Sequence, residues 1–208
     1  MEKKWFVALL MVVVMMCACW TGAVADEERK TFTSGDYQYA LLDDGTVEIA
    51  GYKGSADLLA IPAELDGKAV TSIGDCAFYL CSSLTSVSIP DSVEQIGTNP
   101  FAACFELKTI SVSPEHPYFA TIDGVLFRKA DKALISYPAS ISSSTYTIPQ
   151  GITSIGDSAF FYCDSLTSVS IPDSITSIGD SAFFWCSSLT SVSIPDSVTS
   201  IGDSAFSY

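Results

Sequence analysis

Histidine, asparagine and basic residues are scarce in this chain. Of its 208 residues, one is a histidine and ten are lysine or arginine. His116 is the only candidate base for a Ser-His-Asp or Cys-His arrangement, and it lies in the segment Pro114–Pro117 with no nucleophile nearby in sequence. We expect an exposed loop residue there rather than a catalytic one, and we expect the protein not to be an enzyme.

The shortage of basic residues gives the chain a strongly acidic balance. Against its ten basic residues stand 24 aspartates and glutamates, so the formal net charge is −14. A field of this sign does not hold nucleic acid or an anionic membrane, so no nucleic-acid partner is expected. Most of the acidic residues stand at turn positions, where aspartate has a local structural role, and solubility is the simplest role of the excess charge.

The first 25 residues have the pattern of a secretory signal peptide. Lys3 and Lys4 precede an apolar run over residues 5–20, and Ala23–Ala25 has the small-x-small pattern of a cleavage site. The run is short for a membrane span, which needs about 20 apolar residues, so a membrane anchor is less favoured. A lipoprotein attached through Cys19 is also less favoured, because Met16 is a poor residue three positions before the cysteine. We expect a secreted or cell-surface protein.

A block of 23 residues repeats along the chain. LTSVSIPDSITSIGDSAFFWCSS begins at Leu166, and LTSVSIPDSVTSIGDSAFSY begins at Leu189, which is 23 residues later. A fixed period in this range is typical of a solenoid, whose repeats bury their apolar sides only against neighbouring repeats. One interval is longer, because 59 residues separate Ile96 from the equivalent Ile155. The sequence therefore predicts a repeat solenoid with one insertion.

Each repeat predicts mainly β structure with short helical turns. From Leu166, apolar residues alternate with serine and threonine, which is typical of a strand whose apolar side faces a core. Pro172–Ser174 then predicts a turn, and Ile175 and Ile178 predict a second short inward-facing stretch. Asp180 is expected to cap one helical turn over residues 181–185. Successive strands should stack as a parallel sheet.

The repeats and their flanks divide the chain into three parts. Residues 1–25 are the signal peptide, and residues 26–57 are a lead-in with a hairpin that caps the first repeat. Within the lead-in, residues 26–33 are predicted to be mobile, and Asp43–Thr46 is the hairpin turn. Residues 58–208 are the solenoid, with an inserted hairpin at 114–145. Insertions in solenoids usually project from one face, where partners bind, so we expect a projecting hairpin.

Four cysteines occupy one register of the repeat: Cys81, Cys104, Cys163 and Cys186. We favour an interior column of small buried thiols, with disulfides or metal as the less favoured alternatives. Cys76 lies five residues before Cys81 and is a possible disulfide partner for it. The cysteines lack the close paired spacing of zinc sites.

Aspartates also recur at fixed registers: Asp157, Asp180 and Asp203 at one, and Asp173 and Asp196 at another. Helix caps or turn bonds are the favoured role, and calcium binding is the alternative. We predict no cofactor and no metal.

The candidate ligand-binding residues are strand hydroxyls and turn aromatics. They are Ser86, Ser88, Ser168, Ser170, Ser191, Ser193, Tyr162 and Trp185. The serines have the outward positions of the strands, where solubility and β-propensity are the alternative explanation. The aromatics either anchor a partner or pack between repeats.

Three segments give the chain a resemblance to a known family. They are SIPDSVTSIGDSAF at 193–206 with its copies, IDGVLFRKADKALISYP at 122–138, and YQYALLDDGTVEIAGY at 37–52. Over about residues 35–208 the chain resembles BspA-type leucine-rich-repeat proteins. The resemblance implies a leucine-rich-repeat-like fold and a secreted or surface bacterial protein that adheres to host matrix or to other cells. It implies a protein or glycan partner on a host or neighbouring cell, without naming the ligand.

The chain departs from the common leucine-rich-repeat pattern in two places. It lacks an asparagine column, because Asn99 is its only asparagine. It also stops at Tyr208, one residue before the next cysteine of the register would occur. An uncovered last repeat predicts end-to-end self-association through that repeat. The alternative function is a structural spacer or a targeting module of a larger envelope protein.

Overall fold

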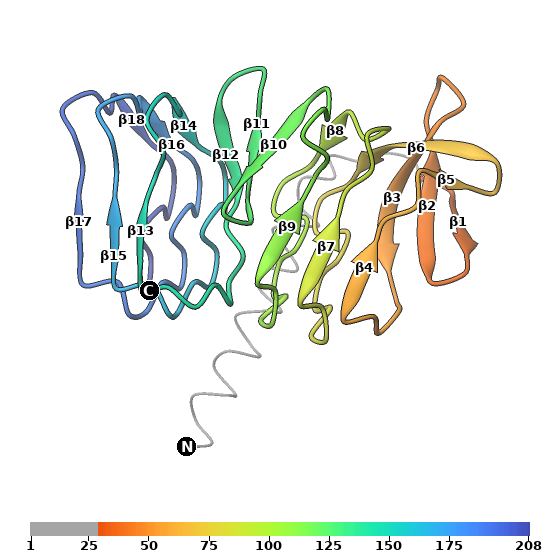
Figure 1. Ribbon diagram of the computed structural model, residues 1–208, viewed down its shortest axis with the longest axis horizontal. Helices are drawn as coiled ribbons and strands as arrows, with labels where there is room; N and C mark the ends of the chain where they lie inside the picture. The colour runs from red at the N-terminus through yellow and green to blue at the C-terminus, as the bar shows by residue number, and fades with distance from the viewer. Residues whose placement is uncertain (1–28) are drawn as a thin grey trace.

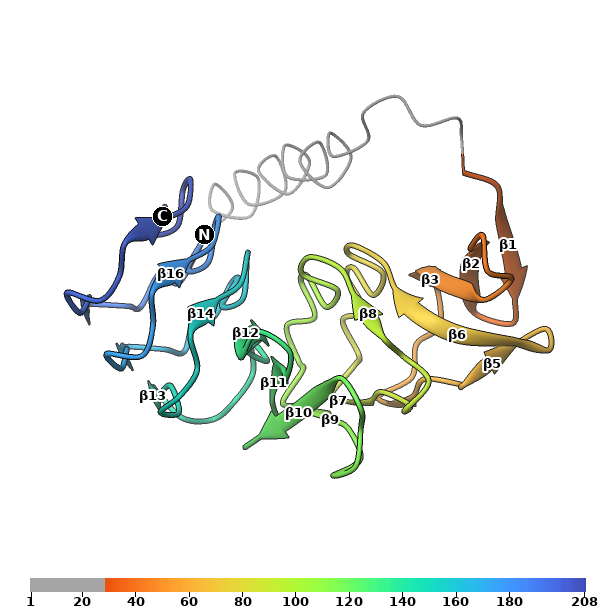
Figure 2. The ribbon, with the colours of Figure 1, turned by 90° about the horizontal axis from the view of Figure 1, so that it is seen from above.

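The computed structural model describes residues 29–208 and shows a mainly β coil of stacked repeats (Figure 1). Seen from above, the repeats follow an arc (Figure 2). Each turn of the coil, called a rung below, carries one strand on the outside of the arc and one on its inside. No helix occurs in residues 29–208, and in this part of the chain no helix is therefore long and apolar enough to cross a membrane. The predicted solenoid with stacked parallel strands is confirmed.

The outer strands form two separate parallel sheets. The first contains β4 (Leu58–Ala60), β7 (Ser86–Ser88) and β9 (Thr109–Ser111), and the second contains β13 (Thr145–Thr147), β15 (Ser168–Ser170) and β17 (Ser191–Ser193). Pairing is in register with the repeat, so that Ser168 lies opposite Ser191 and Val169 opposite Val192. The valines point into the core because the side chains of a strand alternate between its two faces.

The inner strands also form two groups. In the N-terminal group, β3 (Val47–Tyr52), β6 (Lys68–Ile73) and β8 (Gln95–Ile96) pair in parallel. In the C-terminal group, β12 (Ala133–Ser136), β14 (Ser154–Ile155), β16 (Ser177–Ile178) and β18 (Ser200–Ile201) do the same. The inner strands are short because a glycine follows the isoleucine in most rungs and ends the strand.

The N-terminal end is closed by antiparallel strands. β2 (Tyr37–Leu41) pairs with β3 as a hairpin, and β1 (Thr31–Ser34) adds outside β2. A second hairpin, β5 (Glu64–Leu65) with β6, lies beside them. The carboxylate of Asp66 accepts hydrogen bonds from the hydroxyls of Ser34 and Tyr39, at 2.6 and 2.8 Å. The expectation of a mobile lead-in is therefore wrong for residues 31–33, which belong to a strand.

The segment after each inner strand is a run of turns rather than a helix. Two non-glycine residues in this segment have positive φ, such as Ser158 at 54° and Tyr162 at 62°. The positive φ values turn every second backbone amide of this segment towards the next rung. The amides of Ser158, Phe160 and Tyr162 donate to the carbonyls of Asp180, Ala182 and Phe184, at 2.8, 2.8 and 2.9 Å. The predicted helical turn is absent because these amides bond between rungs, not within one.

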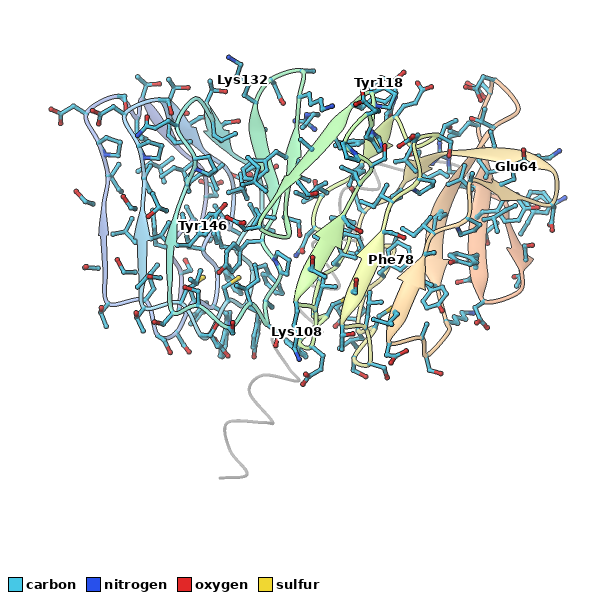
Figure 3. All side chains as sticks on the ribbon, viewed as in Figure 1. Glu64, Phe78, Lys108, Tyr118, Lys132 and Tyr146 are labelled. Atoms are coloured by element: carbon cyan, nitrogen blue, oxygen red, sulfur yellow. The ribbon has the colours of Figure 1, made fainter. Side chains whose placement is uncertain are left out.

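Stacked phenylalanines fill the centre of each rung. Phe160 and Phe183 lie 4.7 Å apart between ring centroids and are 0% and 2% exposed. Phe78 and Phe101 stack in the same way in the N-terminal rungs, at 5.4 Å. Figure 3 shows Phe78 among the N-terminal strands and Tyr146 among the C-terminal strands. The buried residues form two hydrophobic clusters, one in each half of the solenoid.

The insertion lies between the two clusters and belongs to both. β10 (Phe119–Ile122), β11 (Val125–Arg128) and β12 form an antiparallel meander. Leu126 packs in the N-terminal cluster, whereas its neighbours Val125 and Phe127 pack in the C-terminal one. β12 is buried along its whole length. The expectation of a projecting hairpin is therefore wrong, because the insertion joins the two halves through a shared core.

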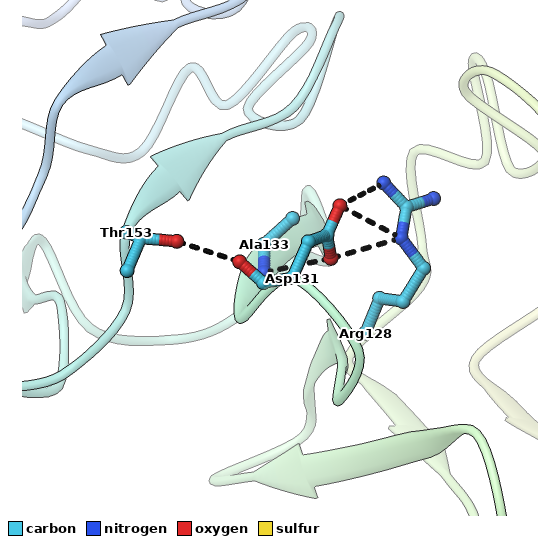
Figure 4. A network of polar contacts seen from close by, with 4 residues as sticks. All are labelled: Arg128, Asp131, Ala133 and Thr153. Atoms are coloured by element: carbon cyan, nitrogen blue, oxygen red, sulfur yellow. Dashed lines mark hydrogen bonds and ion pairs between the residues drawn. The ribbon is translucent and has the colours of Figure 1, made fainter.

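Polar contacts fix the turn of the insertion to the next rung (Figure 4). The guanidinium of Arg128 donates to both carboxylate oxygens of Asp131, and the backbone amide of Ala133 donates to the same carboxylate at 3.3 Å. The hydroxyl of Thr153 donates to the carbonyl of Asp131 at 2.6 Å. The Arg128 guanidinium lowers the pKa of Asp131 through these hydrogen bonds. The turn is therefore part of the stack.

Candidate binding surfaces

The strand serines form regular rows on the outside of the arc. Ser168 and Ser170 lie opposite Ser191 and Ser193, in adjacent strands of one sheet. The valine between each pair of serines faces the core, so the hydroxyls face solvent. Ser86 and Ser88 occupy the same positions in β7, but they belong to the other outer sheet, on the far side of the insertion. The structure thus brings four of the six serines together and separates the remaining two.

Tyr162 and Trp185 stack on each other in the turn segments, away from the serine rows. Their rings are 5.3 Å apart between centroids and nearly parallel, at 2°. The column continues to Phe105 on one side and to Tyr208 on the other. Both rings are only partly buried, so their edges reach the surface while their faces contact each other. This packing between rungs is one of the two alternatives that the sequence left open.

Asp157 and Asp180, which follow the Ile-Gly pair of their repeats, bond to the neighbouring rung. A carboxylate oxygen of Asp157 accepts the amide of Asp180 at 2.8 Å, and Asp180 accepts the amide of Asp203 at 2.7 Å. The carboxylate lies over the glycine of the next rung, and a Cβ on Gly179 would overlap it. These aspartates therefore link rungs instead of capping a helical turn. Within residues 29–208, no group of three histidine, cysteine, aspartate or glutamate side chains is placed to hold a metal ion.

The four cysteines of the repeat register are buried and carry free thiols. The Cys186 and Cys104 thiols donate to the carbonyls of Phe160 and Phe78, both at 3.0 Å. Burial raises the pKa of Cys163 well above its usual value. The favoured interior column is confirmed for these four residues, and the suggested Cys76–Cys81 disulfide is wrong because the Cys81 thiol is free.

His116 is buried, with 0% of its surface exposed, so the expectation of an exposed loop residue is wrong. Its ring Nε2 lies 3.1 Å from the carbonyl oxygen of Pro90, and Nδ1 accepts the amides of Tyr118 and Phe119, both at 3.2 Å. The neutral ring therefore carries its proton on Nε2. Burial lowers the pKa of His116. Nδ1 thus holds the backbone of the insertion and Nε2 holds that of the preceding rung, so the histidine has a structural role.

The inside of the arc contains a cleft of about 510 Å³ that sequence reasoning missed. One side of the cleft is formed by residues 96–99, and the other by the insertion and the inner strands of the C-terminal half. Asp75, Asp157 and Asp180 line it, together with Ser154 and Ser177. The cleft exists because of how the insertion lies between the two halves, and no local sequence motif predicts that arrangement.

The family profile described as "BspA type Leucine rich repeat region" matches six copies over residues 63–143 and 136–208. No curated protein matches the chain.

Several solved structures, including the following three, are similar to this chain. A leucine-rich repeat protein from Eubacterium ventriosum has a TM-score of 0.60 and 20% identity, over 83% of this chain and 68% of that chain. The pneumococcal vaccine antigen PcpA has a TM-score of 0.55 and 17% identity, over 85% and 78%. A T. pallidum leucine rich repeat protein has a TM-score of 0.50 and 28% identity, over 83% and 86%. The first two similarities concern the fold alone.

Proposed function

The chain belongs to the BspA-type leucine-rich-repeat family, and on this premise we propose that it is a non-enzymatic binding module at the cell surface or outside the cell. Its partner is a protein or a glycan on a host or neighbouring cell, and its role is adhesion. Proteins of this family are typically bacterial surface or secreted repeat proteins. The signal-peptide pattern of residues 1–25, which lies outside the described residues, supports export.

The observation that carries this proposal is the regular outer face of the C-terminal half. Ser168, Ser170, Ser191 and Ser193 present hydroxyls at fixed positions on strands whose other side is locked into the core. A rigid array of hydrogen-bonding groups loses little conformational entropy when it binds, which favours recognition of an extended partner.

A binding assay with face-specific variants tests the proposal. The mature protein is passed over immobilised matrix proteins and a glycan array, beside the variant Ser170→Arg/Ser193→Arg. The matched control is Ser142→Arg/Gln150→Arg, which adds the same charge at exposed positions off the outer strands. We expect binding that the first variant loses and the control keeps. Equal binding by all three proteins would show that the outer face is not the binding site. Binding to no protein or glycan would contradict the proposed adhesive function.

A structural role is the second candidate. The last rung exposes large apolar side chains, namely Ile194, Ile201 and Phe206, at 41%, 49% and 40%. Apolar surface of this kind favours contact with a further repeat, a second copy or another envelope component. A chain that binds no external partner but associates through this rung would favour the spacer over the adhesin.

A further inference from the structure

The inner strands of the solenoid do not form one continuous ladder of paired strands, because the pairing stops where the insertion begins. β8 pairs with β6 on one side, and among residues 29–208 it has no strand partner on its other side. The next inner strands, β12 and β14, lie on the opposite side of the cleft and pair with each other. Figure 2 shows β8 and β14 on the inside of the arc, in the two halves of the coil. The break therefore leaves one strand edge facing the cleft.

The edge of β8 presents unpaired backbone groups whose equivalents elsewhere are bonded. In the C-terminal half, the carbonyls of Thr153 and Ile155 accept the amides of Thr176 and Gly179, both at 2.8 Å. Their equivalents 59 residues earlier are Glu94 and Ile96. Within the described part of the chain, no hydrogen bond to either of these two carbonyls crosses the break. Two carbonyls in alternate positions are the acceptors that an added parallel strand would use.

The amide of Asn99, three residues after β8, is unpaired in the same way. The amide of Ser158 donates to the next rung, whereas that of its equivalent, Asn99, has no acceptor among residues 29–208. Asn99 lines the open cleft. Asn99 also lines a separate cavity of about 10 Å³, bounded by residues 99–107, 136–139 and 158–162, which has room for one water molecule. A ligand strand therefore has access to the cleft-lining residues 96–99 and to the exposed Glu94 and Gln95 beside them.

The charges around the cleft are complementary to a cation. Asp75, Asp157 and Asp180 line it and are exposed. Each uses one carboxylate oxygen to accept an amide of the next rung, at 2.6 to 2.8 Å, so the other oxygen remains for a ligand. The only basic side chain at the cleft is Arg128, within the residues that the structure describes, and it is paired with Asp131. The cleft thus carries net negative charge.

We propose that the break is a binding site for an extended basic polypeptide segment. Its backbone adds to β8 as a parallel strand and bonds to the carbonyls of Glu94 and Ile96. Its lysine or arginine side chains lie against the free carboxylate oxygens of Asp157 and Asp180. A polypeptide fits better than a glycan because a strand presents backbone amides at the two-residue spacing of these carbonyls. The inference rests on the proposed function, since it specifies one site and one class of partner for it.

Backbone-modified peptides test the strand pairing. The probe is a fluorescent nonapeptide of alternating lysine and threonine, and its affinity for the mature protein is measured at 150 mM salt. Two further peptides carry N-methyl groups on all lysines or on all threonines. A peptide that adds as a regular strand, with amides two residues apart on the carbonyls of Glu94 and Ile96, turns only one of the two sets of amides towards β8. We therefore expect methylation of one set to weaken binding about tenfold or more and methylation of the other to have a much smaller effect. Equal effects of the two methylations would overturn the proposal.

Isosteric charge variants test the location. Asp157→Asn/Asp180→Asn keeps an oxygen for the bond between rungs and removes two charges from the cleft, while Asp173→Asn/Asp196→Asn removes two charges from turns that do not line it. We expect about fivefold or greater weakening for the first pair and less than about twofold for the second. Thr98→Trp, an exposed position in the cleft, should block the peptide without disturbing the core.

The outcomes separate this inference from the proposed function. Equal losses in the two aspartate pairs would show attraction by the net charge alone and would refute the site. If the peptide fails to bind while an external partner still depends on Ser170 and Ser193, the inference falls and the proposed function stands. If no external partner binds but the peptide behaves as expected, the cleft is supported as a binding site and adhesion through the outer face is refuted.

Discussion

At the scale of single residues, inward and outward positions of a rung differ in their contribution to stability. Phe183 is 2% exposed and stacks between Phe160 and Phe206, at 4.7 and 5.0 Å. Phe183→Ala should lower the free energy of unfolding by about 3–5 kcal/mol, because it leaves a cavity between rungs. Ser191→Ala should change it by less than about 0.5 kcal/mol, since Ser191 is exposed. Urea unfolding measures both changes. A larger loss of stability for Ser191→Ala than for Phe183→Ala would mean that the inward and outward faces have been assigned the wrong way round.

His116 should make stability depend on pH. Burial lowers its pKa in the folded state below the ordinary value of 6.5, so the unfolded state binds the proton more readily. The stability that His116 contributes is present above pH 6.5 and is lost as the pH falls from 6.5 towards its folded pKa. Protonation would place a proton on Nδ1, where two backbone amides already donate.

Thermal unfolding of the native protein and of His116→Gln between pH 7.5 and 5 tests this prediction. Taking the difference between the two proteins removes the contribution of the carboxylates, which are common to both. We expect the native protein to lose more stability on acidification than the variant. Parallel pH profiles would show that His116 is already charged or is not buried in solution.

At the scale of the element, three pairs of neighbouring rungs are linked by an aspartate lying over a glycine, as Asp157 lies over Gly179. A Cβ on Gly179 would lie 2.6 Å from the backbone nitrogen of Asp157, as well as overlapping its carboxylate. Gly179→Ala should therefore destabilise by about 1–3 kcal/mol, as overpacking does, and removing the carboxylate with Asp157→Ala should not rescue it. Ser177→Ala, two residues earlier in the same rung, should cost less than about 0.5 kcal/mol. If Asp157→Ala fully restored the stability lost in Gly179→Ala, overlap with the carboxylate would be the sole cause of that loss, which would contradict the prediction.

The sequence predicts the elements of a rung well and their connections less well. The 23-residue period and the alternation around Val169 establish the outer strands, because only a stacked repeat buries one face of each short strand. The positive φ of Ser158 and Tyr162 is not visible in their residue types, since serine and tyrosine do not favour it. Bonds between rungs impose that conformation, and a local reading of Asp180 as a helix cap cannot include them.

The insertion shows the same limit. Val125-Leu126-Phe127 is an unbroken apolar run, which is typical of a strand buried on both faces. A projecting hairpin has one face in water and would alternate polar and apolar residues. The composition of the run therefore held the signal for a shared core, but the general tendency of insertions to project outweighed it. His116 gave no such signal, because its partners lie on Pro90 and on the backbone of β10.

At the scale of the whole molecule, the 208-residue chain presents an apolar last rung. We expect it to self-associate through this rung, because Ile194, Ile201 and Phe206 are about half exposed and the edges of β17 and β18 are unpaired within residues 29–208. Like ends that meet give a closed twofold pair. Sedimentation of the chain, with and without a polar capping repeat added after Tyr208, measures this. A chain that stays monomeric at high concentration, or a cap that changes nothing, would contradict it.

The central claim is that this solenoid is two stacked halves with a broken inner ladder, joined by a buried insertion. Amide hydrogen exchange tests it most directly, because equivalent amides in the two halves serve as controls for each other. The amides of Ser158, Phe160 and Tyr162 are bonded to the next rung and should exchange slowly. Their equivalents at Asn99, Phe101 and Ala103 have no such bond among residues 29–208 and should exchange much faster. Equal protection of the two sets would contradict the account, since it would mean that the ladder runs unbroken through the insertion.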